Sequence, residues 1–143
     1  MSPAESPLRG HELPAGGFRV EPAEDGRLRE VLGSPAGAGE AHPLWAYIAA
    51  QRGIGVSVAE LCALAEFDVA DGPLLGSVEI ELAGPIGAGE ELWVEGEIVD
   101  LVRKEGRSGR FDLLVFEERL RDREGRVVSR CRNTFVLPRR EES

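Results

Sequence analysis

The pattern of apolar and polar residues divides the chain into a helical part followed by a part rich in strands. Residues 41–67 form the longest segment with little charge, and only this segment keeps the spacing of apolar residues that a helix produces. The stripe expected to face the core consists of Leu44, Tyr47, Ile48 and Gln51. Gly53 suits the end of this first helix.

A second helix is expected to begin directly after Ser57. Ser57 and Glu60 have the spacing of a capping box, in which the serine hydroxyl accepts from the Glu60 amide and the Glu60 carboxylate reaches back. The apolar stripe continues through Val58, Leu61, Cys62 and Ala65. Because residues 44–66 include few polar side chains, the sequence predicts a mostly buried helical segment.

The period of the pattern changes from helical to alternating at about Leu74. Residues 74–82 alternate apolar and polar side chains, which predicts a strand with one face in water. Three more strands are predicted over residues 92–102, 110–121 and 126–137. Residues 113–116 are apolar on both faces, as expected for a central strand with a helix on one side and something else, such as another subunit, on the other. We therefore expect an α+β fold in which a curved antiparallel sheet wraps around a long central helix.

The chain length of 143 residues fits one domain. Residues 1–17 are rich in Pro, Gly and Glu and are predicted to be a flexible arm. Residues 18–138 would form the single domain, starting with a short strand over 18–20, and residues 139–143 a charged tail. The first residues lack the basic start and apolar core of a secretory signal, and no apolar run approaches the length that spans a bilayer. We expect a cytoplasmic protein.

The net charge of −9 argues against nucleic acid and against an anionic membrane surface as partners, because both are bound mainly by a surplus of Lys and Arg. The charge is uneven, and residues 103–143 carry twelve basic and eight acidic groups. Arg103, Lys104 and Arg107 lie around one predicted turn. They form either a basic rim for a phosphate-bearing ligand or an ordinary solvated face.

The cysteines and histidines do not indicate a metal site. Cys62 and Cys131 lack metal-ligand spacing and are expected to be small buried residues without a disulfide. The sequence also lacks a P-loop and a glycine-rich dinucleotide fingerprint. We expect no cofactor.

Several segments are similar to those of one protein family. Residues 41–45 (AHPLW) open the predicted helix, and residues 84–92 (GPIGAGEEL) resemble a family turn of the form Arg-Pro-Leu-x-x-Gly-Asp-x-Leu. Residues 107–109 (RSG) and 133–136 (NTFV) add to the likeness. On these motifs, residues 41–137 resemble the MaoC-like dehydratases, especially the fatty-acid-synthase-type (3R)-hydroxyacyl dehydratase subunits. The resemblance implies a hotdog fold, a sheet that continues across a homodimer or heterodimer, and acyl thioesters of coenzyme A or acyl carrier protein as ligands.

The resemblance also indicates where a thioester would bind. Free backbone N–H groups at the start of the buried helix, near Leu44, Trp45 and Ala46, would stabilise charge on a thioester carbonyl. Active family members place an Asp and a His in an Asp-x-Asn-Pro-x-His segment just before the helix. Here Ser34 stands where the Asp is expected, no Asn precedes the proline, and the next histidine is His42.

The candidate site residues each have two readings. His42 is an N-terminal cap, a packed polar residue or an acid/base group. Trp45 and Phe67 either line an acyl tunnel or belong to the core. Glu60 is the carboxylate that a hotdog thioesterase would need on its central helix, but its place in the capping box already explains it.

Three hypotheses of different classes follow. In the first and favoured one, the chain is a non-catalytic subunit that binds acyl thioesters and pairs with a hydratase or dehydratase subunit carrying the Asp and His. In the second, it is itself an enzyme, either an (R)-specific enoyl-CoA hydratase/3-hydroxyacyl dehydratase that uses His42 or a thioesterase that uses Glu60. In the third, it only binds an acyl thioester or a protein partner.

Overall fold

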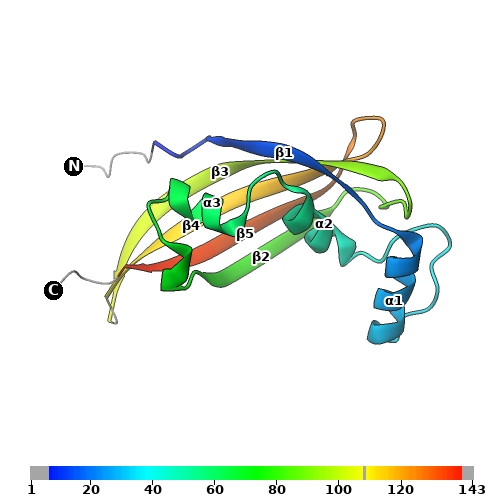
Figure 1. The fold of residues 1–143 in the computed structure, drawn as a ribbon, viewed down its shortest axis with the longest axis horizontal. Coiled ribbons are helices and arrows are strands. Elements are labelled where there is room, and N and C mark those ends of the chain that lie inside the picture. The colour runs from blue at the N-terminus through cyan, green and yellow to red at the C-terminus, as the bar shows by residue number, and fades with distance from the viewer. Residues whose placement is uncertain (1–6, 108, 140–143) are drawn as a thin grey trace.

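The computed structural model describes residues 7–107 and 109–139 and contains one antiparallel sheet with helices on one face (Figure 1). The strands are β1 (Glu12–Arg19), β2 (Leu74–Leu82), β3 (Glu91–Gly106), β4 (Gly109–Arg121) and β5 (Val127–Arg139). The helices are α1 (Pro22–Leu32), α2 (Trp45–Gly53), α3 (Val58–Leu64) and the short 3-10 helix η1 (Val69–Asp71). The strand order β1-β3-β4-β5-β2 places β1 and β2 at the two edges. The predicted α+β class and antiparallel sheet are confirmed.

The central helical segment is divided into two helices at the place that the sequence predicted, so it does not form one long helix. α2 ends at Gly53, and α3 begins after Ser57 with the predicted capping box: the Glu60 amide donates to Ser57 Oγ, and the Ser57 amide donates to the Glu60 carboxylate, each at 3.1 Å. The buried side of α2 is formed by Trp45, Ala46, Ala49, Ala50 and Gly53. The predicted stripe therefore lies beside the buried side, since Tyr47, Ile48 and Gln51 are half-buried and Leu44 and Val58 are exposed.

The first strand is longer than predicted and corrects the boundary of the flexible arm. β1 begins at Glu12 and pairs with β3, so the arm predicted for residues 1–17 is wrong for residues 12–17. The sequence did not predict this strand over residues 12–17, because Pro14 and two glycines interrupt the alternating pattern and favour turns. The pairing accommodates them with a register shift between Leu13 and Gly16. Residues 1–6 and 140–143 of the predicted arm and tail lie outside the described residues.

The break between α2 and α3 lies where β1 crosses the helix end. A Cβ atom added at Gly16 would lie 1.9 Å from the carbonyl oxygen of Gly53, and one added at Gly53 would lie 2.5 Å from a methyl group of Val94. The Gly55 amide donates to the Pro14 carbonyl at 2.8 Å across the same crossing. Only glycine allows strand and helix backbones to approach this closely.

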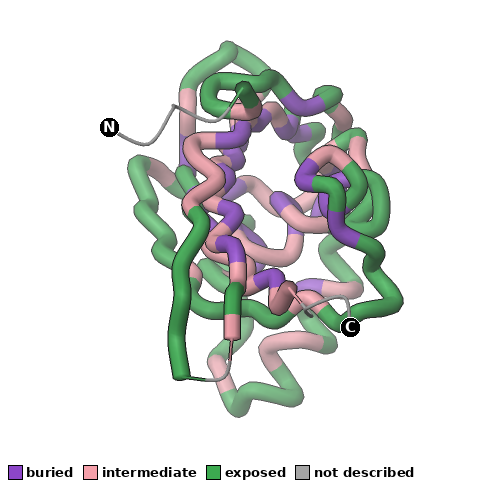
Figure 2. Tube along the Cα trace, turned by 90° about the vertical axis from the view of Figure 1, so that its left-hand side faces the viewer, coloured by how far each residue is buried: buried purple, intermediate pink, exposed green. Residues whose placement is uncertain are grey.

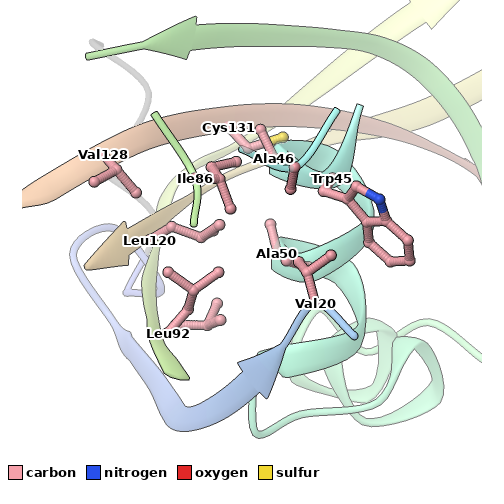
Figure 3. Packing of buried hydrophobic residues seen from close by; sticks show 12 residues of the cluster. Val20, Trp45, Ala46, Ala50, Ile86, Leu92, Leu120, Val128 and Cys131 are labelled. Atoms are coloured by element: carbon pink, nitrogen blue, oxygen red, sulfur yellow. The ribbon is translucent and has the colours of Figure 1, made fainter. Parts of the chain in front are cut away.

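The core consists of two clusters along the inner face of the sheet. Figure 2 shows which parts of the strands and helices are buried. The first packs α2 against the strands, and Figure 3 shows Ala46 and Ala50 facing Leu92 and Leu120, with Trp45 at the other side of the cluster. The second packs α3 against the other end of the sheet, with Leu61, Cys62, Phe67, Ile98, Leu114, Phe116 and Leu137 buried. Each fully buried leucine contributes on the order of 2 kcal/mol to stability. Both cysteines are free and buried, as predicted.

Strand β2 stays largely uncovered by the helices. Its apolar residues Leu74, Leu75, Ile80 and Leu82 are 43–58% exposed. The alternating pattern along β2 predicted one face in water and one buried face. The second face is not fully buried, because β2 is an edge strand and α2 packs mainly on the middle of the sheet. The structure therefore has an apolar edge.

The glycine crossing makes a testable prediction. Gly16→Ala should lower the free energy of unfolding by about 2 kcal/mol or more, because the new methyl group overlaps the Gly53 carbonyl. Gly26→Ala is the matched control: Gly26 lies inside α1 with open space around it, so alanine should stabilise by about 0.5–1 kcal/mol. Urea unfolding followed by tryptophan fluorescence measures both. Equal stability of Gly16→Ala and wild type would contradict the crossing.

Candidate functional site

Asp25 of α1 is a buried carboxylate that fixes the start of α2. Its Oδ1 accepts hydrogen bonds from the His42 amide at 2.7 Å and from the Trp45 indole at 3.1 Å. Its Oδ2 accepts from Arg29 Nε at 2.9 Å. Burial acts to raise the pKa of Asp25, but the His42 amide and Arg29 outweigh it and hold this pKa below its ordinary value. With both oxygens bonded, Asp25 serves as an anchor.

The backbone amides at the start of α2 are already bonded. The Leu44 amide donates to His42 Nδ1 at 3.1 Å, the Trp45 amide to the His42 carbonyl at 2.9 Å, and the Ala46 amide to the Pro43 carbonyl at 3.0 Å. The expectation that these three amides are free for a thioester carbonyl is therefore wrong in this structure. Any part that the three residues play in binding a ligand stays a prediction.

The ring of His42 acts as a cap. Because Nδ1 accepts from the Leu44 amide, the neutral ring carries its proton on Nε2. The carboxylate that reaches His42 is Asp25, and it bonds the backbone of His42. This geometry matches the capping role that the sequence left open. The catalytic role of His42 stays a prediction.

Arg29 holds in place the loop that contains Ser34, the residue at the position expected for the Asp. Its two terminal nitrogens donate to the carbonyls of Pro35 and Glu40, each at 3.0 Å, and the Ser34 amide donates to the Arg29 carbonyl at 2.8 Å. Ser34 lies in the wall of a hollow of about 550 Å³, together with Asp25 and Arg29. Ser34, at the position expected for the Asp, thus supplies a hydroxyl to the same hollow as the Asp25–Arg29 ion pair.

The other candidate residues lie toward the opposite end of the sheet. Arg103 bonds Asp112 at 3.1 Å near the β3–β4 hairpin, where Lys104 and Arg107 are exposed. Phe67 is buried in the α3 cluster, with the Arg139 guanidinium over its ring, so it is core. From Leu92, beside the start of α2, to Arg103 the strand runs about 35 Å. The structure therefore does not bring the basic residues and the helix start together within one chain.

A carboxylate that the sequence analysis did not single out lies in the middle of the inner face. Glu118 of β4 is fully buried, and its Oε1 accepts from Gln51 Nε2 at 2.7 Å and from Asn133 Nδ2 at 2.9 Å. Its Oε2 has no hydrogen-bond partner among the described residues. Burial raises the pKa of Glu118 to about 7, and the two amide donors oppose this rise only in part. Leu114, Phe116, Glu118 and Leu120 occupy alternate positions of β4, and this alternation predicts that the Glu118 side chain lies on the inner face.

An apolar groove lies between α2 and the edge strand β2. It has a volume of about 450 Å³ and is lined by Tyr47, Ile48, Gln51, Arg52, Val58, Pro73, Leu74, Leu75 and Phe135. A smaller cavity of about 70 Å³ includes Glu118 in its wall and shares Gln51, Val58 and Phe135 with the groove. Three of the four residues in the stripe predicted from the sequence, Tyr47, Ile48 and Gln51, thus line the groove.

Glu60 does not form part of this groove or cavity. Its side chain is exposed and bonded to Ser57, whose backbone and hydroxyl hold the pKa of Glu60 below its ordinary value. A capping carboxylate in water has no raised proton affinity to use in catalysis. The geometry thus favours the capping role for Glu60.

Comparison with known proteins gives the family. Residues 46–131 match the family model described as FAS1-like, dehydratase domain region. The chain belongs to this family. No curated protein matches the sequence of this dehydratase-family chain.

Solved structures confirm the hotdog fold of this dehydratase-family chain. The HadBC (3R-hydroxyacyl-ACP dehydratase) complex of Mycobacterium tuberculosis matches with a TM-score of 0.69 and 17% identity, over 92% of this chain and 98% of that one. The MaoC-like dehydratase of Rhodospirillum rubrum matches with a TM-score of 0.59 and 17% identity, over 94% of each chain. The ChsH1–ChsH2 complex of M. tuberculosis has a TM-score of 0.69 and 14% identity, over 93% and 87%.

Within residues 7–107 and 109–139, no three His, Cys, Asp or Glu side chains are grouped so that they could hold a metal ion. Over the same ranges, none of the helices has the length and apolar character needed to cross a bilayer.

Glu118 should make stability depend on pH. Between its ordinary value of 4.5 and about 7, the folded protein keeps a proton that the unfolded chain has lost, so stability falls as the pH rises through this range. That difference corresponds to on the order of 3 kcal/mol. Glu118→Gln should remove this loss of stability. Urea unfolding at pH values between about 4 and 8, in steps of roughly half a unit, would measure it, because this range includes both pKa values of Glu118. Exposed Glu79 supplies the control Glu79→Gln, and identical pH profiles for wild type and Glu118→Gln would contradict the assignment.

Proposed function

We propose that this chain is a hotdog subunit that binds acyl thioesters of coenzyme A or acyl carrier protein and lacks its own acid/base pair. In this proposal it works beside a second hotdog subunit that carries the Asp and the His of an (R)-specific enoyl hydratase or 3-hydroxyacyl dehydratase. The family membership supports the ligand class. The observation that carries the non-catalytic role is that His42 and Asp25, the His and carboxylate at the helix start, are both engaged in holding the backbone.

Adding water to an enoyl thioester requires more than the bonded groups at the helix start can supply. One group must take a proton from water and another must protonate the carbon next to the carbonyl. Asp25 has both oxygens bonded, and a hydroxyl stands at position 34. A positioned acid/base group contributes on the order of a hundredfold to ten-thousandfold in rate. The chain alone would then bind a thioester and turn over very little.

The uncovered β2 edge supports pairing with another subunit. An edge strand with exposed backbone groups and exposed Ile80 and Leu82 would associate readily unless another chain covers it. The two M. tuberculosis structures named above are complexes, HadBC and ChsH1–ChsH2. For this chain, we propose a homodimer or a heterodimer in which the β2 edge is covered.

A hydration assay tests the catalytic part. The purified chain should consume a trans-2-enoyl-CoA negligibly, as followed by loss of the enoyl absorbance, and His42→Ala should change nothing. Adding a hotdog chain that has the Asp-x-Asn-Pro-x-His segment should restore turnover. Rapid hydration by the lone wild-type chain that collapses in His42→Ala would overturn the proposal and make His42 catalytic.

Light scattering tests the pairing. The wild-type chain, alone or with such a partner, should be at least dimeric at micromolar concentration, and the double variant Ile80→Lys, Leu82→Lys should be monomeric because the charges face the proposed interface. Val31→Lys, at the most exposed apolar residue of α1, is the control and should leave the dimer intact. A wild-type monomer under all of these conditions would contradict pairing through β2.

A further inference from the structure

The buried oxygen of Glu118 without a partner is the feature that the proposed function leaves unexplained. A buried polar atom without a hydrogen bond costs on the order of 1–3 kcal/mol in general, so native proteins rarely keep one without a use. Oε1 already accepts from two amide groups. Oε2 has no partner among the described residues, and Glu118 lies in the wall of the 70 Å³ cavity.

Gly96 of β3 lies opposite Glu118 in the sheet, and the chain is closely packed on this side. A Cβ atom added at Gly96 would lie 2.7 Å from the Glu117 carbonyl oxygen, 3.3 Å from Ile54 and 3.5 Å from the Glu118 side chain. The other walls of the cavity include Leu13, Leu61 and Phe116. The cavity is therefore apolar except for the cluster formed by Glu118 and its donor Gln51, together with Ser57 at its edge.

Gln51 lies between this cavity and the 450 Å³ groove. It lines both of them, and its amide nitrogen bonds both Glu118 and Asn133. Val58 and Phe135 complete the shared wall. Glu118 and the groove therefore lie on the two sides of one layer of side chains.

We propose that Glu118 recognises an oxygen atom on the acyl chain of the ligand, at a distance from the thioester, while the apolar part of that chain fills the α2–β2 groove. The protonated carboxyl donates from Oε2 to a carbonyl or hydroxyl oxygen, and Gln51 and Asn133 hold the carboxyl in place through Oε1. Glu118 is thus a specificity residue, and the ligand class is an acyl thioester oxidised near the far end of its chain. This inference rests on the proposed function for the thioester part of the ligand.

The protonation state that this contact needs is set by the neighbours of Glu118. Tyr47 from α2 and Cys131 from β5 are the titratable groups close enough to affect it, and burial keeps the pKa values of both above their ordinary values. Both side chains are therefore neutral between about pH 5 and 8, since even the upper end of this range lies about two units below the ordinary pKa of tyrosine. Arg52 lies at the rim of the outer groove, and Gly96 of β3 carries no charge.

The test compares straight-chain acyl-CoAs with analogues that carry a ketone on the carbon next to the terminal methyl group. A ketone only accepts hydrogen bonds, so it probes the protonated carboxyl alone. By calorimetric titration at about pH 6, one unit below the midpoint expected for Glu118, the purified chain should bind the best ketone analogue about threefold to tenfold more tightly than the plain acyl-CoA. The preference should disappear as the pH rises through the range in which Glu118 ionises.

Two variants separate recognition from folding. Glu118→Gln keeps an acceptor for Gln51 and Asn133 and supplies an N–H donor that does not titrate, so its preference should persist at high pH. Glu118→Leu should lose the preference at every pH, and Glu117→Gln, on the opposite face of the same strand, should behave as wild type. If Glu118→Leu does not fold, the pH-independence of Glu118→Gln decides the question.

The outcomes distinguish this inference from the function on which it rests. Equal binding of the ketone and plain acyl-CoAs by the wild type, at every pH, would overturn the role of Glu118 and leave the thioester function standing. Binding of neither ligand would overturn both. A preference that Glu118→Gln loses at all pH values would also contradict the donor role.

Discussion

The length of α2 is the constraint on which the rest of the structure depends. A helix of nine residues spans about 14 Å, whereas β3, with sixteen residues, runs for about 50 Å. One such helix cannot cover the inner face of the sheet. The helical segment is interrupted where β1 crosses it, and α3 packs over the other end of the sheet. The core therefore has two clusters instead of one. Among the described residues, α2 leaves most of β2 uncovered, and the groove lies between the two.

Glu118 lies between these two clusters, where α2 leaves off and α3 begins. A carboxyl in this position is unfavourable for stability above pH 7, since ionisation there would place a charge beside apolar side chains with only two amide donors. A leucine at position 118 would be of similar size, but it would remove the acceptor that Gln51 and Asn133 share. The three residues therefore depend on one another, and the polar cluster is maintained as a unit or replaced as a unit.

The sequence predicted most of the fold because the strong patterns act locally. The capping box at Ser57 and Glu60 and the alternation along β4 depend on neighbours within a few residues, and both hold in the structure. The failures involve contacts between distant segments. β1 carries Pro14 and Gly16 because it crosses a helix end nearly forty positions later, and no local pattern reports such a crossing. Asp25 looked like one acid in a short polar helix, yet it bonds residues 17 and 20 positions away.

Under the proposed function, one added carboxylate at position 34 would not complete an acid/base pair at the start of α2. An aspartate in place of Ser34 would enter the hollow that already contains Asp25, and two nearby carboxylates raise each other's pKa, which by itself suits a general acid. The ring of His42 would still be bonded to the Leu44 amide, and Arg29 would still hold the loop at Pro35 and Glu40. Under the proposed function, chemistry at this end of α2 would require a different backbone between α1 and α2, because the present one engages His42 Nδ1 and both oxygens of Asp25. The groove does not depend on that loop, since residues of α2, β2 and β5 line it.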